Sequence, residues 1–260
     1  MGTRVTIRLA VLIAACALMI GRLLAAEEVR VMTSGGFAAT HLALVAPFER
    51  ATANRVVTVT TSTGVGADSI PSRVRRGEPV DIVILSDAAI DDLIRDGFIV
   101  AGSKVPLARS GIGMAVRAGT PRPDIRTVDG LKRALLQAAS IAISAQTSGV
   151  YLSTELFPRL GIADQLKAKT QRIERERVGA VVARGDAEVG FQQISELLPI
   201  TGIDYIGPLP AEAQRITLFS AGVAKAATSP EAARALIRFY TSSEGAEMAV
   251  ATGLEKLPPR

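Results

Sequence analysis

The stretch RGEPVDIVILSDAAIDDLIRDG, residues 76–97, decides the fold class. Residues 80–85 form a largely apolar run, which is typical of a parallel strand buried on both faces of a sheet. Ser86 and Asp87 follow at once and can cap a helix, which the pattern extends over residues 88–96. A buried strand that leads directly into a helix is the repeating unit of a doubly wound α/β sheet.

The same alternation continues outward in both directions. Towards the N-terminus, strands are expected at residues 29–32 and 56–60, and each is followed by a helical stretch. Towards the C-terminus, strand and helix signals alternate as far as residue 251. We find no repeat and no long linker. Two lobes without a linker must be connected within strands, and we expect the crossings near residues 107–114 and 216–223.

At 260 residues the chain is long enough for two small domains. The sequence therefore predicts an α/β fold of two doubly wound lobes joined by a hinge. The expected division is a signal peptide at residues 1–26, lobe I at residues 27–108 plus 224–260, and lobe II at residues 109–223.

Residues 1–26 have the composition of a secretory signal. Arg4 and Arg8 precede an apolar run over residues 9–20, and two alanines then precede an acidic pair. The run is shorter than the roughly 20 residues that span a bilayer. We expect a cleaved leader and a periplasmic protein. A retained anchor and a lipoprotein attached through Cys16, the only cysteine, are the alternatives.

The composition excludes several partners. Aromatic residues make up 4% of the chain and tryptophan is absent, which argues against sites that stack sugars or bases. The three arginines of the leader account for over half of the formal net charge of +5, so the remainder is too weakly basic to indicate a nucleic-acid partner. We expect a monomer that binds a small ligand.

The first long helix is expected to end near residue 50. Its predicted inner positions are Leu42, Val45, Ala46 and Phe48, whereas His41 is expected to face solvent or to cap a packing edge. His41 is the only histidine, and the leader holds the only cysteine, so a zinc site of the usual kind is excluded. No other metal site and no cofactor is indicated.

Six motifs, taken in order, resemble the periplasmic solute-binding proteins of ABC transporters, of the type II fold that includes the molybdate-binding proteins. They are TSGG (33–36), APFERAT (46–52), TSTG (61–64), RGEPVDIVILSD (76–87), GDAEVGF (185–191) and TSPEAARALIRFYTSSEGAEMAVATGL (228–254).

The resemblance implies two lobes that close on a ligand in the cleft between them. It also implies that the N-terminal segment and the last helices share one lobe, and that an ABC transporter permease is the partner. On this basis the chain is expected to bind and deliver a solute rather than to act as an enzyme.

Several polar turns follow predicted strands and open helices, where free backbone N–H groups and the helix dipole favour an anion. The candidate ligand residues in these turns are Ser34, Gly35, Ser62, Thr63, Thr147, Ser148 and Gly149. The resemblance assigns the turns matching TSGG and TSTG to the anion. Taken alone, each turn is better explained by ordinary helix capping, because serine and threonine at helix starts cap far more often than they contact a ligand.

Three further candidates lie near these turns. Arg109, at the first crossing, could form a bidentate pair with a carboxylate, and a surface position is its alternative. Tyr151 could supply a hydroxyl or be buried in its lobe. Gln192 stands near a point where molybdate-binding relatives often have a tyrosine, and its amide both donates and accepts. We therefore favour an organic carboxylate, such as a di- or tricarboxylate, over molybdate.

Two other functions remain open from the sequence. The same fold can serve as a ligand-sensing domain that signals to a membrane partner. An exported enzyme would need a nucleophile beside a base, and the lone histidine disfavours a Ser–His pair. The sequence contains no GxSxG, P-loop or HExxH motif.

Overall fold

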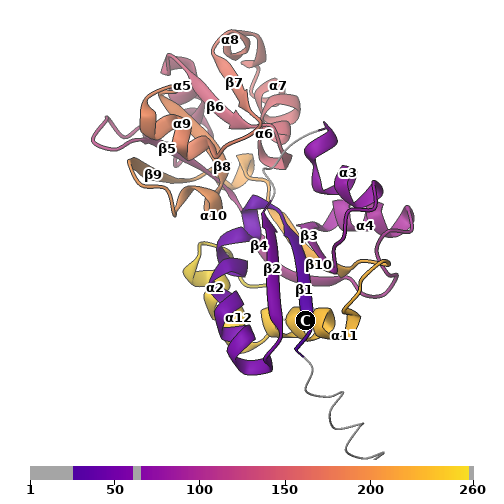
Figure 1. The fold of residues 1–260 in the computed structure, drawn as a ribbon. Coiled ribbons are helices and arrows are strands. Elements are labelled where there is room, and N and C mark those ends of the chain that lie inside the picture. Colours follow the sequence, from indigo (N-terminus) through magenta and orange to yellow (C-terminus); the bar gives the residue numbers. More distant parts are fainter. Residues whose placement is uncertain (1–25, 61–65, 258–260) are drawn as a thin grey trace, which may run out of the picture.

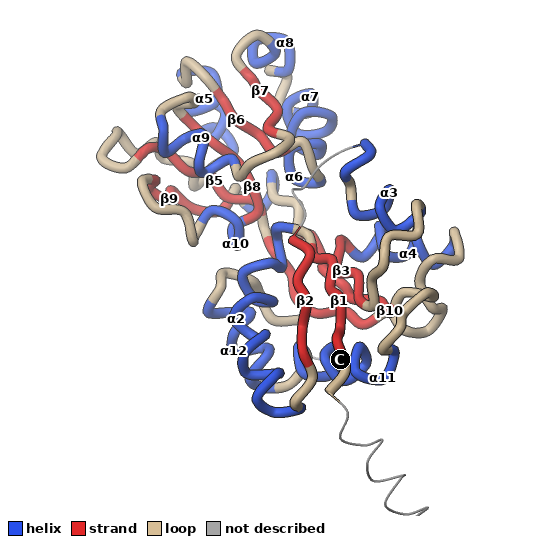
Figure 2. Tube along the Cα trace, in the orientation of Figure 1, coloured by secondary structure: helices blue, strands red, loops and turns tan. Residues whose placement is uncertain are grey.

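The computed structural model of the protein describes residues 26–60 and 66–257. The predicted signal peptide up to residue 25, with Cys16, lies outside the described residues, and so do Ser62 and Thr63. The described residues form two five-stranded sheets with helices packed against them (Figure 1; Figure 2). This arrangement confirms the predicted α/β fold of two lobes. We use lobe I for the sheet that contains the N-terminal strand and its helices, and lobe II for the other.

The lobe I sheet has the strand order β2-β1-β3-β10-β4. β1 pairs in parallel with β2 and β3, whereas β10 is antiparallel to β3 and β4. The strands are β1 (Glu28–Thr33), β2 (Arg55–Thr60), β3 (Ile82–Ser86), β4 (Val105–Ser110) and β10 (Thr217–Val223). The helices are α2 (Gly35–Thr52), η1 (Gly66–Asp68), α3 (Ile70–Arg75), α4 (Asp87–Arg95), α11 (Pro230–Tyr240) and α12 (Ser243–Ala251).

The lobe II sheet repeats this plan with the order β7-β6-β8-β5-β9. β6 is parallel to β7 and β8, and β5 is antiparallel to β8 and β9. The strands are β5 (Ile112–Arg117), β6 (Ile141–Ser144), β7 (Thr170–Ile173), β8 (Val189–Gln193) and β9 (Ile203–Pro208). The helices are α5 (Val128–Gln137), α6 (Thr147–Tyr151), η2 (Leu152–Leu156), α7 (Phe157–Arg159), α8 (Ala163–Lys167), α9 (Val178–Arg184), α10 (Ile194–Leu197) and η3 (Ala211–Ala213).

The chain passes between the sheets twice, and one side chain ties the two crossings together. Only Gly111 separates β4 from β5, and residues 209–216 lead back from β9 to β10. The amide of Gln214 accepts a hydrogen bond from the Ile112 N–H (2.8 Å) and donates one to the Ile112 carbonyl oxygen (3.0 Å). The connection between the lobes is therefore a bonded pair of segments rather than a loose linker.

The return crossing differs from the division expected from the sequence. Residues 217–223, which the sequence analysis expected to hold the return crossing at the end of lobe II, form β10 inside the lobe I sheet. They pair there in antiparallel register, with Gly222 opposite Val83 on β3 and Phe219 opposite Ala108 on β4. The apolar pattern of a strand carries no information about its neighbours, so the local sequence did not reveal this partner choice.

The central strand β3 is buried on both faces, as its apolar run predicts. Ile82 and Ile84 pack in the cluster under α2, α11 and α12, whereas Val83 and Leu85 pack under α3 and α4. Successive strand residues point to opposite faces, so a strand covered by helices on both sides must be apolar throughout.

His41 corrects the expected orientation of α2. Its side chain is fully buried rather than solvent-facing, and Leu42, expected inside, is 52% exposed. The imidazole Nδ1 lies 2.6 Å from the hydroxyl oxygen of Tyr240, and Nε2 lies 2.8 Å from the hydroxyl oxygen of Thr58. A polar residue occupies the inner face because both of its nitrogens find partners there.

Burial lowers the pKa of His41 to about 4, from an ordinary value of 6.5. The unfolded chain therefore takes up a proton at a higher pH than the folded chain. We expect His41 to cost up to about 3 kcal/mol of stability as the pH falls from 6.5 to 4. Urea denaturation of the protein and of His41→Gln at several pH values would measure this. A stability difference between the two proteins that does not shrink towards pH 4 would contradict it.

Candidate functional site

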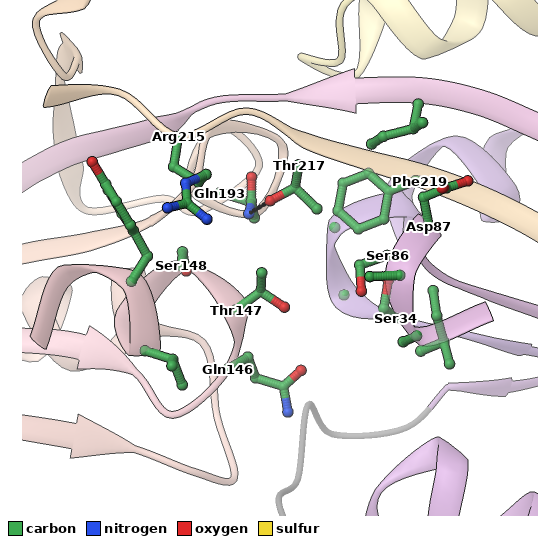
Figure 3. Close-up of a pocket in the computed structure, with 18 of the residues that line it drawn as sticks. Ser34, Ser86, Asp87, Gln146, Thr147, Ser148, Gln193, Arg215, Thr217 and Phe219 are labelled. Atoms are coloured by element: carbon green, nitrogen blue, oxygen red, sulfur yellow. Dashed lines mark hydrogen bonds between the residues drawn. The ribbon is translucent and has the colours of Figure 1, made fainter. Parts of the chain in front are cut away.

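A cavity of about 840 Å³ lies between the two lobes. In lobe I, the residues that line it lie in the turns after β1 and β3 (Figure 3). In lobe II, they lie in the turn after β6 and at the start of α10, and further lining residues come from the return crossing. These turns lie at the carboxyl ends of strands, where open α/β sheets bind their ligands.

Two serines on the lobe I side stand at helix starts without capping them. Ser34 precedes α2 and Ser86 precedes α4, and neither side chain makes a capping hydrogen bond. The Ser34 hydroxyl is buried and has no hydrogen-bond partner among the described residues. A buried hydroxyl without a partner is costly, so one that faces a cavity is suited to bind a ligand.

The glycines after Ser34 allow an aromatic ring to close the cavity floor. A Cβ atom on Gly36 would lie 2.3 Å from the ring of Phe219, which also lines the cavity. Gly35 lines the cavity beside it, in the first turn of α2. The first turn of a helix has N–H groups without intrahelical partners, so this turn offers backbone donors.

The facing turn in lobe II carries Gln146, Thr147 and Ser148, which lie across the cavity from Ser34 and Ser86 (Figure 3). Thr147 and Ser148 open α6, so this helix also begins at the cavity. Each lobe therefore directs helix starts and hydroxyl groups at the same space.

Gly149, a sequence candidate, does not line the cavity. Its Cβ would lie 1.7 Å from the carbonyl oxygen of Ser144, so only glycine allows α6 to start this close to the end of β6. Its place in the structure is explained by packing.

Arg215 lines the cavity and was missed by the sequence analysis. Its guanidinium carbon lies 4.5 Å from the ring centroid of Tyr151, and it forms an ion pair with Glu155. The Tyr151 hydroxyl donates to the carbonyl oxygen of Ala213 (2.9 Å). Tyr151 therefore contacts Arg215 through the face of its ring and not through its hydroxyl. Arg215 stands in the return crossing, one residue before the range 216–223 that the sequence analysis expected for it.

Arg109 and Gln192 do not line the cavity. Arg109 pairs with the carboxylate of Glu255 (3.1 Å). The Gln192 oxygen accepts the Val178 N–H (2.9 Å), because alternate residues of β8 point to opposite faces. Its neighbour Gln193 lines the cavity instead.

The Gln193 amide is held at the junction of the lobes. In the orientation that satisfies both ends, its oxygen accepts from the Thr217 hydroxyl (2.8 Å) and its nitrogen donates to Ser110 and Gly111. Gln193 therefore joins the cavity wall to both crossings.

Three carboxyl groups line the cavity in different surroundings. Asp87 accepts a hydrogen bond from Ser220 (2.6 Å) and pairs with Lys104 (3.1 Å). Glu155 pairs with Arg215. Glu196 is buried, and desolvation raises its pKa from 4.5 to about 7, against the opposing influence of Arg177. The wall thus combines donors, one guanidinium and one carboxyl group that can be neutral near pH 7.

Within residues 26–60 and 66–257 there is no group of three or more histidine, cysteine or acidic side chains able to hold a metal ion. In the same part of the chain, no helix has the length and apolar character needed to cross a membrane.

A family model described as bacterial extracellular solute-binding protein matches residues 29–255. This chain belongs to that family. The match covers nearly all of the described residues of this solute-binding protein and confirms the resemblance found in its motifs.

Solved structures of similar fold include binding proteins for molybdenum transport. The periplasmic molybdate-binding protein of Azotobacter vinelandii has a TM-score of 0.72 and 22% identity, covering 89% of this chain and 100% of that one. The substrate-binding domain of a putative molybdenum ABC transporter from Clostridium difficile has a TM-score of 0.66 and 17% identity, covering 90% and 100%. At these identities the likeness concerns the fold.

A protein from Pseudomonas sp. named aconitate isomerase is 42% identical to this solute-binding protein over 240 residues, which cover 91% of this chain and 92% of that protein. The family and the structural neighbours are binding proteins, whereas this relative is named as an enzyme. Both binding and catalysis are therefore represented among proteins similar to this one.

Proposed function

We propose that this solute-binding protein takes a tricarboxylate of the aconitate class into the cavity between its lobes and interconverts the double-bond isomers. The observation that carries the proposal is the wall itself, on which anion-binding helix starts from both lobes surround a guanidinium and a carboxyl group of raised pKa. The 42% identity to a protein named aconitate isomerase supports the choice of acid.

The wall suits a carbon skeleton with carboxylates better than a compact oxyanion. Leu85, Phe219 and Ile216 supply apolar surface between the polar turns. A tetrahedral oxyanion is best surrounded by donors alone, whereas this wall also presents carboxyl oxygens at Glu155 and Glu196. An acid with several carboxylates can place each of them at a different turn.

The cavity, at about 840 Å³, is larger than a six-carbon acid requires. Donors on Ser34 and Ser148 come from different lobes, so a small ligand would touch both only after the lobes approach each other. Closure about the two crossings is therefore part of the proposed binding mechanism.

Calorimetric titration with cis-aconitate, trans-aconitate, molybdate and spermidine would test the ligand. NMR of the aconitate samples would then follow conversion of one isomer into the other. We expect binding of both aconitates and their interconversion. Binding of molybdate or spermidine with no response to either aconitate would contradict the proposal.

Ser34→Ala is expected to weaken tricarboxylate binding about tenfold or more, because a hydrogen bond to a charged group contributes roughly 1.5–3 kcal/mol. The free protein should not be destabilised, since the Ser34 hydroxyl has no partner among the described residues. Ser242→Ala is the matched control. Ser242 caps α12 through the Gly245 N–H (3.2 Å) and does not line the cavity, so its loss should lower the melting temperature and leave affinity unchanged. Equal affinity in Ser34→Ala and the unmodified protein would contradict this role.

A second candidate function is delivery of the same acid to an ABC transporter permease, and the family match favours it. In this reading the protein is a periplasmic monomer released from the leader predicted at residues 1–26. Uptake of labelled aconitate by cells lacking the gene would test it. Undiminished uptake would contradict the delivery function, and isomerisation would then be the one proposed function that stands.

A further inference from the structure

Glu196 occupies an unusual place among the cavity residues. It lies on α10, which packs against α2 of lobe I, and the neighbouring Ser195 hydroxyl donates to the Gly36 carbonyl oxygen across the lobes (2.7 Å). The Glu196 side chain is buried, yet it forms part of the cavity wall.

One oxygen of the Glu196 carboxyl group is fixed. The Gln192 oxygen accepts the Val178 N–H (2.9 Å), so the amide nitrogen of Gln192 must point the other way. That nitrogen donates to Glu196 Oε1 (2.9 Å). No hydrogen bond joins the other carboxyl oxygen to a described residue, and Glu196 lines the cavity.

We infer that Glu196 is the catalytic acid–base that moves the proton when the bound tricarboxylate isomerises, an assignment that rests on the proposed function. The other two carboxylates of the described wall are unsuited to this task. Asp87 is in an ion pair with Lys104, and Glu155 is in an ion pair with Arg215.

The proton transfer balances without a co-reactant. Ionised Glu196 takes a proton from the methylene carbon of aconitate, so a C–H bond breaks and an O–H bond forms. The released electron pair makes a new double bond to the central carbon, while the original π pair moves to the former vinyl carbon and its carboxylate. Protonated Glu196 exchanges its O–H proton with solvent water and then gives a proton to that vinyl carbon, which becomes the new methylene.

The geometry of the product follows from how the site holds the substrate. The former methylene arm becomes the vinyl arm, and the orientation in which the site binds this arm determines whether the new double bond is cis or trans. No rotation about a double bond is therefore needed. Negative charge that develops on the substrate carboxylate would be stabilised by Arg215 and the Ser34 hydroxyl.

Burial supports this assignment, because it raises the pKa of Glu196 to about 7. A group that must both take and give a proton works best when its pKa lies near the operating pH. Burial has the largest effect on the pKa of Glu196 and raises it, whereas the charge of Arg177 and the hydrogen bond from Gln192 lower it.

The test compares Glu196→Gln with the unmodified protein in D₂O, using trans-aconitate and NMR. Two rates are measured, the formation of cis-aconitate and the entry of deuterium into the substrate carbons. We expect both rates to fall at least 100-fold in Glu196→Gln, while calorimetry shows trans-aconitate affinity within about threefold. Glu196→Asp keeps the carboxyl group and should retain part of the deuterium exchange. Glu244→Gln changes an exposed carboxylate at the start of α12, outside the cavity, and should leave both rates unchanged.

The outcomes separate the two proposals. Full exchange in Glu196→Gln, with normal affinity, would overturn the role of Glu196 and leave the proposed function standing. If the unmodified protein binds no aconitate, the proposed function fails instead. Glutamine has the shape of a protonated glutamate and can still accept from Gln192, so this variant is expected to fold. If it does not, a reduced but measurable exchange rate in a folded Glu196→Asp would support the role, and an exchange rate equal to that of the unmodified protein would count against it.

Discussion

Arg215→Gln is expected to weaken tricarboxylate binding about 100-fold. Arg215 is the one cationic side chain that lines the cavity among the described residues, and a charge-assisted pair with a carboxylate is among the strongest polar contacts a protein makes. Truncating one partner of such a pair typically costs about 2–5 kcal/mol of binding free energy. The Tyr151 ring, 4.5 Å from the guanidinium carbon, helps to hold the side chain at the cavity.

Arg109→Gln provides the matched control for this variant. Arg109 lies in the other crossing and pairs with Glu255 (3.1 Å), away from the cavity wall. Its substitution should leave affinity unchanged, since an exposed ion pair contributes little even to stability. Calorimetric titration of both variants with trans-aconitate makes the comparison. Equal affinities would show that Arg215 does not contact the ligand.

Glu196→Gln should stabilise the free protein at pH 8, by up to about 3 kcal/mol. The folded protein holds the Glu196 proton up to a pH of about 7, whereas an ordinary glutamate loses it near 4.5. The unmodified protein therefore loses stability as the pH rises through this window, and glutamine, which has no such proton, does not.

The measurement is the free energy of unfolding of both proteins in urea at pH 4 and pH 8. The difference should be small at pH 4 and reach its full value above pH 7. The contribution of His41 is the same in both proteins and cancels in the comparison. A difference that does not depend on pH would mean that Glu196 titrates normally. Together with the loss of proton transfer, the expected result would make Glu196 a residue kept for activity at a cost in stability.

The fold could be predicted from local patterns because both lobes are built from buried strands that lead into helices. The run in β3 and the turns after β1 and β6 carry that signal directly. The position of β10 could not be predicted in this way, since pairing between β10 and β3 joins residues more than 130 positions apart. The inner face of α2 was also misjudged, because His41 is buried through its bonds to Tyr240 and Thr58.

The candidate site divides along similar lines. Ser34, Thr147 and Ser148 belong to turns with recognisable sequences, and these residues line the cavity. Arg215 and Glu196 do not belong to a recognisable local sequence motif. Their surroundings depend on how the return crossing and α10 pack between the lobes, and neither the burial of a carboxyl group nor the ring beside an arginine can be read from neighbours in the sequence.

The place of β10 between β3 and β4 also fixes the order in which the molecule can be assembled. A ribosome must reach residue 223 before the lobe I sheet can be completed, and by then residues 112–208, the whole of the lobe II sheet, have already been synthesised. Until that moment β3 and β4 have no strand between them, so the first lobe persists as an unfinished sheet with unpaired edges. The sheet that begins with the first strand of the described chain is therefore completed last, after every strand of the other sheet has been made.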